Sequence, residues 1–373
     1  MPRISLCMIV RDEEAHLASC LTSVRDVVDE LVVVDTGSRD GTRELARTFG
    51  ARVLERAWSD DFAAARNAAL AEATGDWVLV LDADEELDRS LHAGAKARAC
   101  LERFVSESPD CVGRVVIENR TGSGETSEAE IPRFFRRVAG AGFTGRIHEH
   151  WTLADGSTPA RADTGLRVVH HGYSPEFVER RSKLERNLKL LELEVNERPE
   201  DAYSWYQLGR TLQLGGLHDG ALEALERALA LASDGDEWPV HAVELGAESL
   251  RSLGRSQQAL ELVESALPFA PERTDTLFLA ALLALDCGDV ERAERGFRSC
   301  LELGPARRGA ERSAAAGSWA AAHNLAVICE HTGRVPEAAE LYRRALAACP
   351  GHRASLAGLA RLDSPLPSAA AIR

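Results

Sequence analysis

The chain has 373 residues, in which 44 Lys and Arg against 59 Asp and Glu give a formal net charge of −15 at pH 7. This length corresponds to about two or three domains, and a content of 45% hydrophobic and 28% charged residues is that of a globular protein, which excludes wholesale disorder. The acidic balance argues against non-specific binding of nucleic acid, so we expect no nucleic-acid partner.

Several sequence features bear on the cellular compartment. No uninterrupted apolar run reaches the roughly 18 residues that a membrane helix needs, so we expect no membrane span. The N-terminal segment becomes charged from Arg11 to Glu14 and lacks the pattern of a signal peptide. The eight cysteines show no C-x-x-C pair and no paired Cys/His spacing, so we expect buried, reduced thiols and no zinc site. These features predict a cytoplasmic protein.

The first half of the chain, up to about Tyr173, alternates β-rich runs with helical stretches. In chain order, the pattern predicts a strand at 4–10, a helix at 13–24, a strand at 30–35, a helix at 42–49, a strand at 52–54, a helix at 62–73 and a strand at 77–82. Strands that alternate with helices of this length indicate βαβ units and a mostly parallel, Rossmann-like sheet.

The second half repeats itself with the period of tetratricopeptide repeats. Windows that open at Ala202, Val240, Thr274 and Trp319 place a glycine at the turn between two helices, small alanines where the helices pack, and in most cases a proline after the second helix. The pattern predicts an all-α solenoid of about four repeats, with insertions around 233–238 and 306–317.

The change from the strand–helix pattern to the helical repeat pattern defines the predicted domain boundaries. An α/β domain covers 1–174, and a linking helix covers 175–200. The solenoid covers 201–362 and ends in a solvating cap helix at 353–362. Residues 363–373 are expected to form a flexible tail.

Acidic residues end two of the predicted strands. Asp35 ends one, and Asp82 ends the other within Asp82-Ala83-Asp84. The carboxyl ends of strands form the ligand crevice of an open α/β sheet, so both acids point to one site. Residues two apart in an extended chain face the same side, so Asp82 and Asp84 can reach one Mg²⁺ or Mn²⁺, which in turn binds a diphosphate. We interpret the charges that follow as loop charges: Glu85, Glu86 and Asp88.

Seven segments of the first half carry a family resemblance. They are 4–14, 35–42, 61–67, 75–84, 132–136, 145–149 and 170–173. Together they resemble family 2 glycosyltransferases of the GT-A fold, a group that includes lipopolysaccharide-core glucosyltransferases. The helical C-terminal extension resembles that of bacterial peptide S-glycosyltransferases of the sublancin type. The resemblance implies a GT-A domain that transfers a sugar from a nucleotide diphosphate, usually UDP, with inversion and a divalent metal.

The resemblance also implies roles for residues at the matching positions. Val10 would line the nucleotide through its backbone, and Asp35 would contact the uridine. Arg66 would lie near the base or the phosphates, as suits a fork-shaped donor. Asp82 would face the ribose, and the neighbouring Ala83 would also contact the nucleotide-sugar.

Further residues are expected around the metal and the diphosphate. Asp84 would bind the metal that bridges the diphosphate, and His170 would reach the metal or the β-phosphate. Arg133, Arg136 and Arg146 are candidates to stabilise the diphosphate leaving group, and each has a surface charge as its alternative role.

Inversion requires a base on the face opposite the departing nucleotide. Glu149 is the candidate base, with His148 and His150 beside it as alternatives. We expect a strand here, in which the two histidines share a face while Glu149 points the other way, so the group is not arranged for zinc.

These observations predict a cytoplasmic, metal-dependent, inverting hexosyltransferase that uses a UDP-sugar, with UDP-glucose as the expected donor. The concave face of the repeats suits an extended peptide, so the expected acceptor is a Cys, Ser or Thr side chain of a peptide or protein. One alternative is a glucosyltransferase that builds lipopolysaccharide core or another envelope glycan. Another is an inactive scaffold that binds a nucleotide-sugar. A homodimer is possible in each case.

Overall fold

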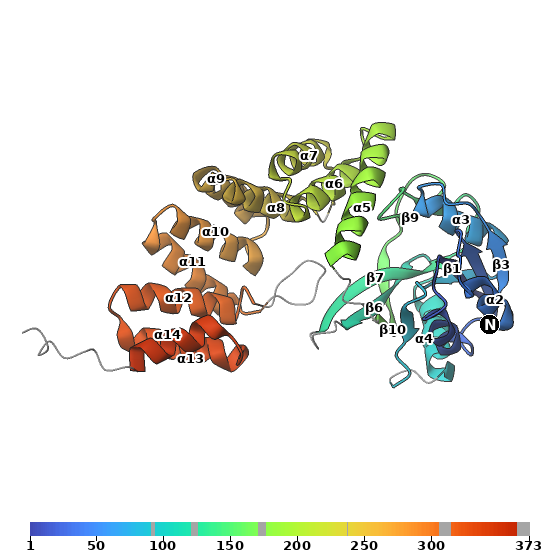
Figure 1. The fold of residues 1–373 in the computed structure, drawn as a ribbon, viewed down its shortest axis with the longest axis horizontal. Coiled ribbons are helices and arrows are strands. Elements are labelled where there is room, and N and C mark those ends of the chain that lie inside the picture. Colours follow the sequence, from blue (N-terminus) through green and yellow to red (C-terminus); the bar gives the residue numbers. More distant parts are fainter. Residues whose placement is uncertain (91–93, 121–125, 171–176, 237, 306–314, 364–373) are drawn as a thin grey trace, which may run out of the picture. The chain divides into compact units, whose positions relative to one another are not determined.

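We analysed a computed structural model, which describes residues 1–373 except 91–93, 121–125, 171–176, 237, 306–314 and 364–373. The chain divides into two compact units, Met1–Arg198 and Pro199–Arg373 (Figure 1). The predicted tail, most of the insertion around 306–317 and the start of the predicted linking helix lie outside the described residues.

A mixed sheet forms the centre of the first unit (Figure 1). Within the described residues the sheet has eight strands in the order β3-β2-β1-β4-β7-β6-β10-β5, and a separate hairpin pairs β8 with β9. Four of the seven described pairings in the large sheet are parallel, which confirms the mostly parallel α/β prediction. The strands are β1 (Ile4–Val10), β2 (Glu30–Asp35), β3 (Arg52–Glu55), β4 (Trp77–Val80), β5 (Glu85–Leu87), β6 (Val112–Arg120), β7 (Thr126–Arg136), β8 (Gly142–Thr144), β9 (His150–Thr152) and β10 (Arg161–His170).

The first unit also contains helices, and one of them begins later than the sequence predicts. They are α1 (Leu17–Val24), α2 (Thr42–Thr48), α3 (Phe62–Glu72), α4 (Gly94–Glu107) and α5 (Phe177–Glu197). The helix predicted at 13–24 starts at Leu17 because the preceding amides are held by the 35–42 loop: the N–H of Glu13 donates to Thr42 Oγ1 at 2.8 Å, and the N–H of Glu14 donates to Asp40 at 3.1 Å.

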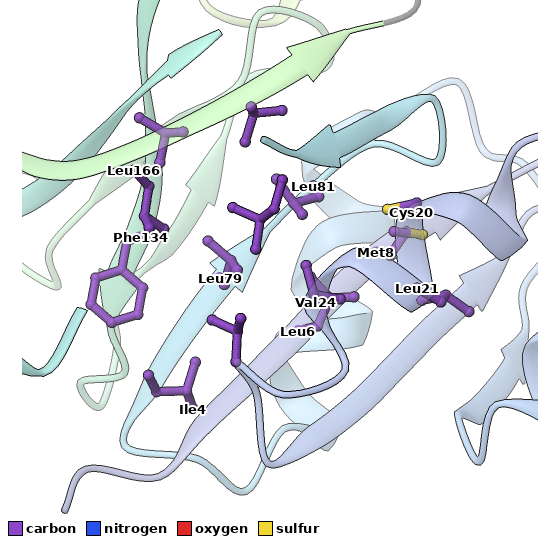
Figure 2. Packing of buried hydrophobic residues seen from close by; sticks show 14 of the residues in the cluster. Ile4, Leu6, Met8, Cys20, Leu21, Val24, Leu79, Leu81, Phe134 and Leu166 are labelled. Carbon is purple, nitrogen blue, oxygen red and sulfur yellow. The ribbon is translucent and has the colours of Figure 1, made fainter. Parts of the chain in front are cut away.

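The core of the first unit lies on both faces of the sheet. Alternate residues of β1 point to opposite sides, so Ile4, Leu6 and Met8 join one buried cluster, while Cys7 joins the other. Figure 2 shows Leu6 and Met8 on the side of the first cluster that faces α1. Burial on both faces explains why these strands are nearly continuous apolar runs in the sequence.

The second unit consists of consecutive helix pairs, as the repeat pattern predicts (Figure 1). Gly216, Gly254, Gly288 and Gly333 stand at the turns with positive φ angles between 73° and 82°, a backbone conformation that glycine adopts without strain. The helices are α6 (Ala202–Leu214), α7 (His218–Leu231), α8 (Pro239–Ser252), α9 (Ser256–Ala266), α10 (Thr274–Asp286), α11 (Val290–Leu303), α12 (Trp319–His331), α13 (Val335–Ala348) and α14 (Arg353–Asp363).

Two further expectations concern the membrane and the thiols. Among the described helices, none combines the length and the apolar character needed to cross a membrane. All eight cysteines lie in described ranges and are free, and four of them are buried: Cys7, Cys20, Cys300 and Cys329. The prediction of buried thiols is wrong for Cys287, which is exposed.

Candidate active site

A tight turn follows β4 and places the two aspartates at the carboxyl end of that strand. The strand ends at Val80, two residues earlier than predicted, because the chain bends at Asp82. The N–H of Asp82 donates to Glu85 Oε2 at 2.9 Å, and the N–H of Glu85 donates back to the carbonyl oxygen of Asp82 at 3.1 Å. Ala83, inside the turn, is buried. The Glu85 side chain thus fixes the conformation of the Asp82–Asp84 segment.

Two buried arginines hold the carboxylate of Asp82. Arg66 comes from α3 and Arg133 from β7, the strand that pairs with β4, and each is only 9% exposed. Arg66 Nη2 lies 3.1 Å from Asp82 Oδ1, and Arg133 Nη2 lies 2.9 Å from Asp82 Oδ2. Burial alone would raise the pKa of Asp82, but the charges of Arg133 and Arg66 outweigh it and hold that pKa well below its ordinary value.

The two arginines keep unused donors. Arg66 Nη1 and Arg133 Nε are buried and find no hydrogen-bond partner among the described residues. Buried N–H groups without a partner carry a free-energy cost of about 1–3 kcal/mol. These donors therefore mark a place where an anionic ligand would be stabilised.

A histidine from the neighbouring strand holds Asp84. Strand register places His170 of β10 opposite Asn119 of β6 and Glu85 of β5. His170 Nε2 lies 3.0 Å from Asp84 Oδ2, and its Nδ1 lies 2.9 Å from Asn119 Oδ1. Both ring nitrogens thus face oxygen atoms, and the hydrogen bond to Asp84 raises the pKa of His170.

The carboxylates at this sheet edge fit a hard cation such as Mg²⁺ that takes its remaining ligands from a bound substrate and water. Among the described residues, no cluster of three or more His, Cys, Asp or Glu side chains is arranged to hold a metal alone. Asp82 pairs with the two arginines and Asp84 with His170, and both carboxylates are partly open to solvent. Mg²⁺ characteristically uses one or two carboxylates, substrate phosphates and water, so Asp84 can hold such an ion only together with a phosphorylated ligand.

Glu13, which the sequence analysis did not select, adds to the negative charge at this edge. Its half-buried carboxyl has a pKa raised to about 7, first because of burial and then because of the neighbouring charges of Asp84, Asp82, Asp40 and Asp12. The sequence could have indicated Glu13 as a site residue, because it lies in the loop directly after β1, at the carboxyl edge of the sheet.

Asp35 and Val10 lie at the neighbouring strand ends. They are opposite each other in the β1–β2 pairing. Asp35 is 1% exposed, and its Oδ1 accepts the N–H groups of Gly37 and Ser38, each at 3.1 Å. The carbonyl oxygen of Val10 accepts the N–H of Thr36 at 2.9 Å. Both residues therefore stabilise the loop after β2, and their contacts with a nucleotide stay predictions.

The segment around Glu149 differs from the predicted strand. β9 begins only at His150, and His148 has a φ of 55°, so the expectation that His148 and His150 share a strand face is wrong. The Glu149 carboxylate forms an ion pair with Nε of Arg66, and both side chains are nearly buried. His150 Nε2 lies 3.3 Å from Thr144 Oγ1. Glu149 is thus joined through Arg66 to Asp82.

Arg136 and Arg146 form ion pairs outside this network. Arg136 lies 3.3 Å from Asp110 and is exposed. Arg146 Nη2 lies 2.6 Å from a carboxylate oxygen of Glu197, and its backbone N–H donates to Glu194 at 2.5 Å. Arg146 therefore anchors α5, and of the three candidate arginines for the diphosphate only Arg133 lies beside the aspartates.

The interpretation of Glu85 as a loop charge is wrong. Glu85 is 4% exposed, and its Oε1 lies 2.6 Å from Arg133 Nη2. Its spacing of three residues from Asp82, which is the spacing of a turn closed by an i to i+3 hydrogen bond, was the signal available in the sequence.

Comparison with known proteins places the two units in known families. A model described as Glycosyl transferase family 2 matches residues 5–188, and tetratricopeptide repeat models match 202–234 and 319–362. A TPR repeat-containing protein of Synechococcus elongatus is 32% identical over 94% of this chain and 76% of its own length.

Two further similarities are partial. The SPbeta prophage-derived glycosyltransferase SunS of Bacillus subtilis is 30% identical over 61% of this chain, which spans about half of SunS (53%). A solved tetratricopeptide repeat protein of Thermus thermophilus is 21% identical, with a TM-score of 0.37 over 50% of this chain and 93% of its own.

Proposed function

The chain belongs to glycosyl transferase family 2 and carries C-terminal tetratricopeptide repeats, and from this premise we propose that it is a metal-dependent, inverting hexosyltransferase of the cytoplasm. The proposed donor is a UDP-hexose, with UDP-glucose as the first candidate. The proposed acceptor is a Cys, Ser or Thr side chain of a peptide or protein.

The buried arginine pair beside Asp82 and Asp84 is the observation that carries the proposal. Arg66 and Arg133 bring two positive charges to the carboxyl edge of the sheet, and each keeps one buried donor without a partner in the described residues. A nucleoside diphosphate supplies the missing acceptors. Donors that are already in place stabilise the charge that develops on the diphosphate when its bond to the sugar breaks.

A divalent cation, Mn²⁺ or Mg²⁺, would neutralise the diphosphate as it leaves. Asp84 would hold this ion together with the diphosphate and water, and His170, joined to Asp84 at 3.0 Å, would orient that carboxylate. Asp82 contributes less to the metal than the sequence predicts, because its oxygens are engaged by Arg66 and Arg133.

The acceptor must lose a proton as it attacks the sugar, and Glu149 is the proposed base, with His148 as the alternative. The ion pair with Arg66 occupies the Glu149 carboxylate, so Glu149 has to be released from Arg66 before it can take the proton of the acceptor. A thiol acceptor reduces this requirement, because a thiol ionises far more readily than a hydroxyl.

The repeats support the peptide acceptor, and the similarity to SunS, which is named a glycosyltransferase, supports the transfer of a sugar. Tetratricopeptide units expose extended concave surfaces that accommodate a chain of residues. The runner-up is a glucosyltransferase for lipopolysaccharide core or another envelope glycan, and the remaining alternative is an inactive scaffold that binds a nucleotide-sugar.

Calorimetry and a UDP-release assay test the proposal. UDP-glucose should bind with Mn²⁺ and be turned over slowly to UDP, and Asp84→Asn should lower the metal-dependent affinity about tenfold or more. Asp110→Asn is the matched control, since Asp110 is an exposed carboxylate that contacts only the exposed Arg136 in the described structure. Binding without any turnover would favour the inactive scaffold. An affinity for UDP-glucose that changes neither on removal of Mn²⁺ nor in Asp84→Asn would overturn the proposed metal dependence.

A further inference from the structure

The second unit contains a hollow that the proposed reaction does not explain. It has a volume of about 470 Å³, which is within the range of sites for small ligands. Its walls come from α6, α8 and α10, from residues just before α12 and from the first turn of α12. The polar side chains of the lining include Gln213, Glu244, Glu248, Arg251 and Asp275.

Two of the charges at this hollow are already compensated. Glu244, which is buried, accepts hydrogen bonds from Arg273 Nε at 2.8 Å and from Arg273 Nη2 at 2.7 Å. Arg251 Nε donates to Asp286 at 2.5 Å. Neither the carboxylate of Glu244 nor the guanidinium of Arg251 therefore requires an external partner.

Glu248 is different. Its carboxylate accepts one described hydrogen bond, from the neutral amide of Gln213 at 3.0 Å, and no ion pair to this carboxylate is found within the described residues. The side chain is open to solvent at the hollow, yet burial by the surrounding protein raises the pKa of its carboxyl. The charges of His241 and Arg251 act against this effect, and that of Glu244 adds to it. The hollow thus has a carboxylate without a described ion pair, with His241 and Arg251 nearby and a second acid, Asp275, on the same wall.

The rest of the wall is largely apolar. Leu245, Phe278, Leu279 and Leu282 line it, and Phe278 is only half-buried. An apolar wall next to a carboxylate that forms no described ion pair complements a lysine or arginine side chain, whose aliphatic stem packs on apolar surface while its charged end meets the acid. A cation near an aromatic ring gains further stabilisation.

We propose that this hollow binds an extended peptide through a lysine or arginine side chain, with the cationic group at Glu248 and the aliphatic stem against Phe278 and its leucine neighbours. The formal charge of −15 on the whole chain favours the approach of a cationic partner. The identification of this peptide with the sugar acceptor rests on the proposed function, whereas the binding itself does not.

A positional-scanning peptide library tests the proposal with the full chain and without any sugar donor. Pools that fix Lys or Arg at one position should bind about tenfold more tightly than pools that fix Ala, Asp or Glu, and added salt should weaken this preference. Glu248→Gln should remove the preference, and Glu248→Lys should transfer it to the Asp and Glu pools. Glu302→Gln, an exposed acid at the end of α11, is the control that should leave the preference unchanged.

Three results would overturn the inference: equal binding of all pools, a Lys and Arg preference that persists in Glu248→Gln, or a self-association in sedimentation that Glu248→Gln abolishes. The last result would assign the hollow to a second copy of this chain. A separate measurement of UDP-glucose turnover tests the proposed sugar transfer independently of the proposed peptide site. Peptide binding without sugar transfer would refute the proposed acceptor while supporting the cation site.

Discussion

Replacement of Glu13 by glutamine should stabilise the first unit at pH 8.5 and leave its stability almost unchanged at pH 4.5, when no divalent cation is present. Glutamine keeps the size of the side chain and removes its charge. The carboxyl of Glu13 is half-buried and stands in the negative field of four aspartates, so its ionised form is disfavoured in the folded protein.

The magnitude follows from the pKa. A change from 4.5 to about 7 corresponds to about 3.4 kcal/mol if solvent does not screen the charges. Because about half of the side chain remains in water, screening reduces the expected effect to about 1–2 kcal/mol. The folded protein binds this proton more tightly than the unfolded chain does. The cost of ionisation is therefore nearly absent at pH 4.5 and below, grows as the pH rises towards 7, and is complete above that pH.

Urea titrations read by hydrogen exchange on peptides of β1 give the free energy of unfolding of the first unit alone. Glu44→Gln, on the exposed surface of α2, is the control and should change stability by less than about 0.5 kcal/mol at both pH values. Saturating Mn²⁺ should diminish the gain from Glu13→Gln, because a cation at Asp84 offsets the repulsion. A gain of equal size at both pH values, or a loss at pH 8.5, would refute the reasoning.

Two further substitutions test the packing on which each unit depends. Glu85→Gln removes a carboxylate from the buried Arg133 and should lower the stability of the first unit by about 1–3 kcal/mol, measured by hydrogen exchange on β7. It should also lower kcat for UDP release. Unchanged stability and kcat would contradict the positioning role of Glu85. Gly209→Ala should destabilise the second unit by about 1–3 kcal/mol, measured by hydrogen exchange on α6, because an added Cβ would lie 2.6 Å from Cγ of Leu225. Gly351→Ala, which meets nothing within 4 Å, is its control.

The sequence by itself determined the architecture and the position of the acidic motif. The bounds of β1 and β2 match the predicted strands, because a nearly continuous apolar run is a local signal of a strand covered on both faces. The repeat glycines predicted the turns of the second unit for a similar reason, since a positive φ selects glycine without reference to distant residues.

Only the tertiary structure decided which charges meet. The partners of Asp82 come from α3 and from β7, which stand 16 and 51 residues away along the chain. Sequence periodicity carries no information on such pairings, because they depend on the strand order that sets β7 beside β4. For the same reason Glu85 became a buried member of the site, while Arg146, which the motif places near the diphosphate, forms its ion pair with α5.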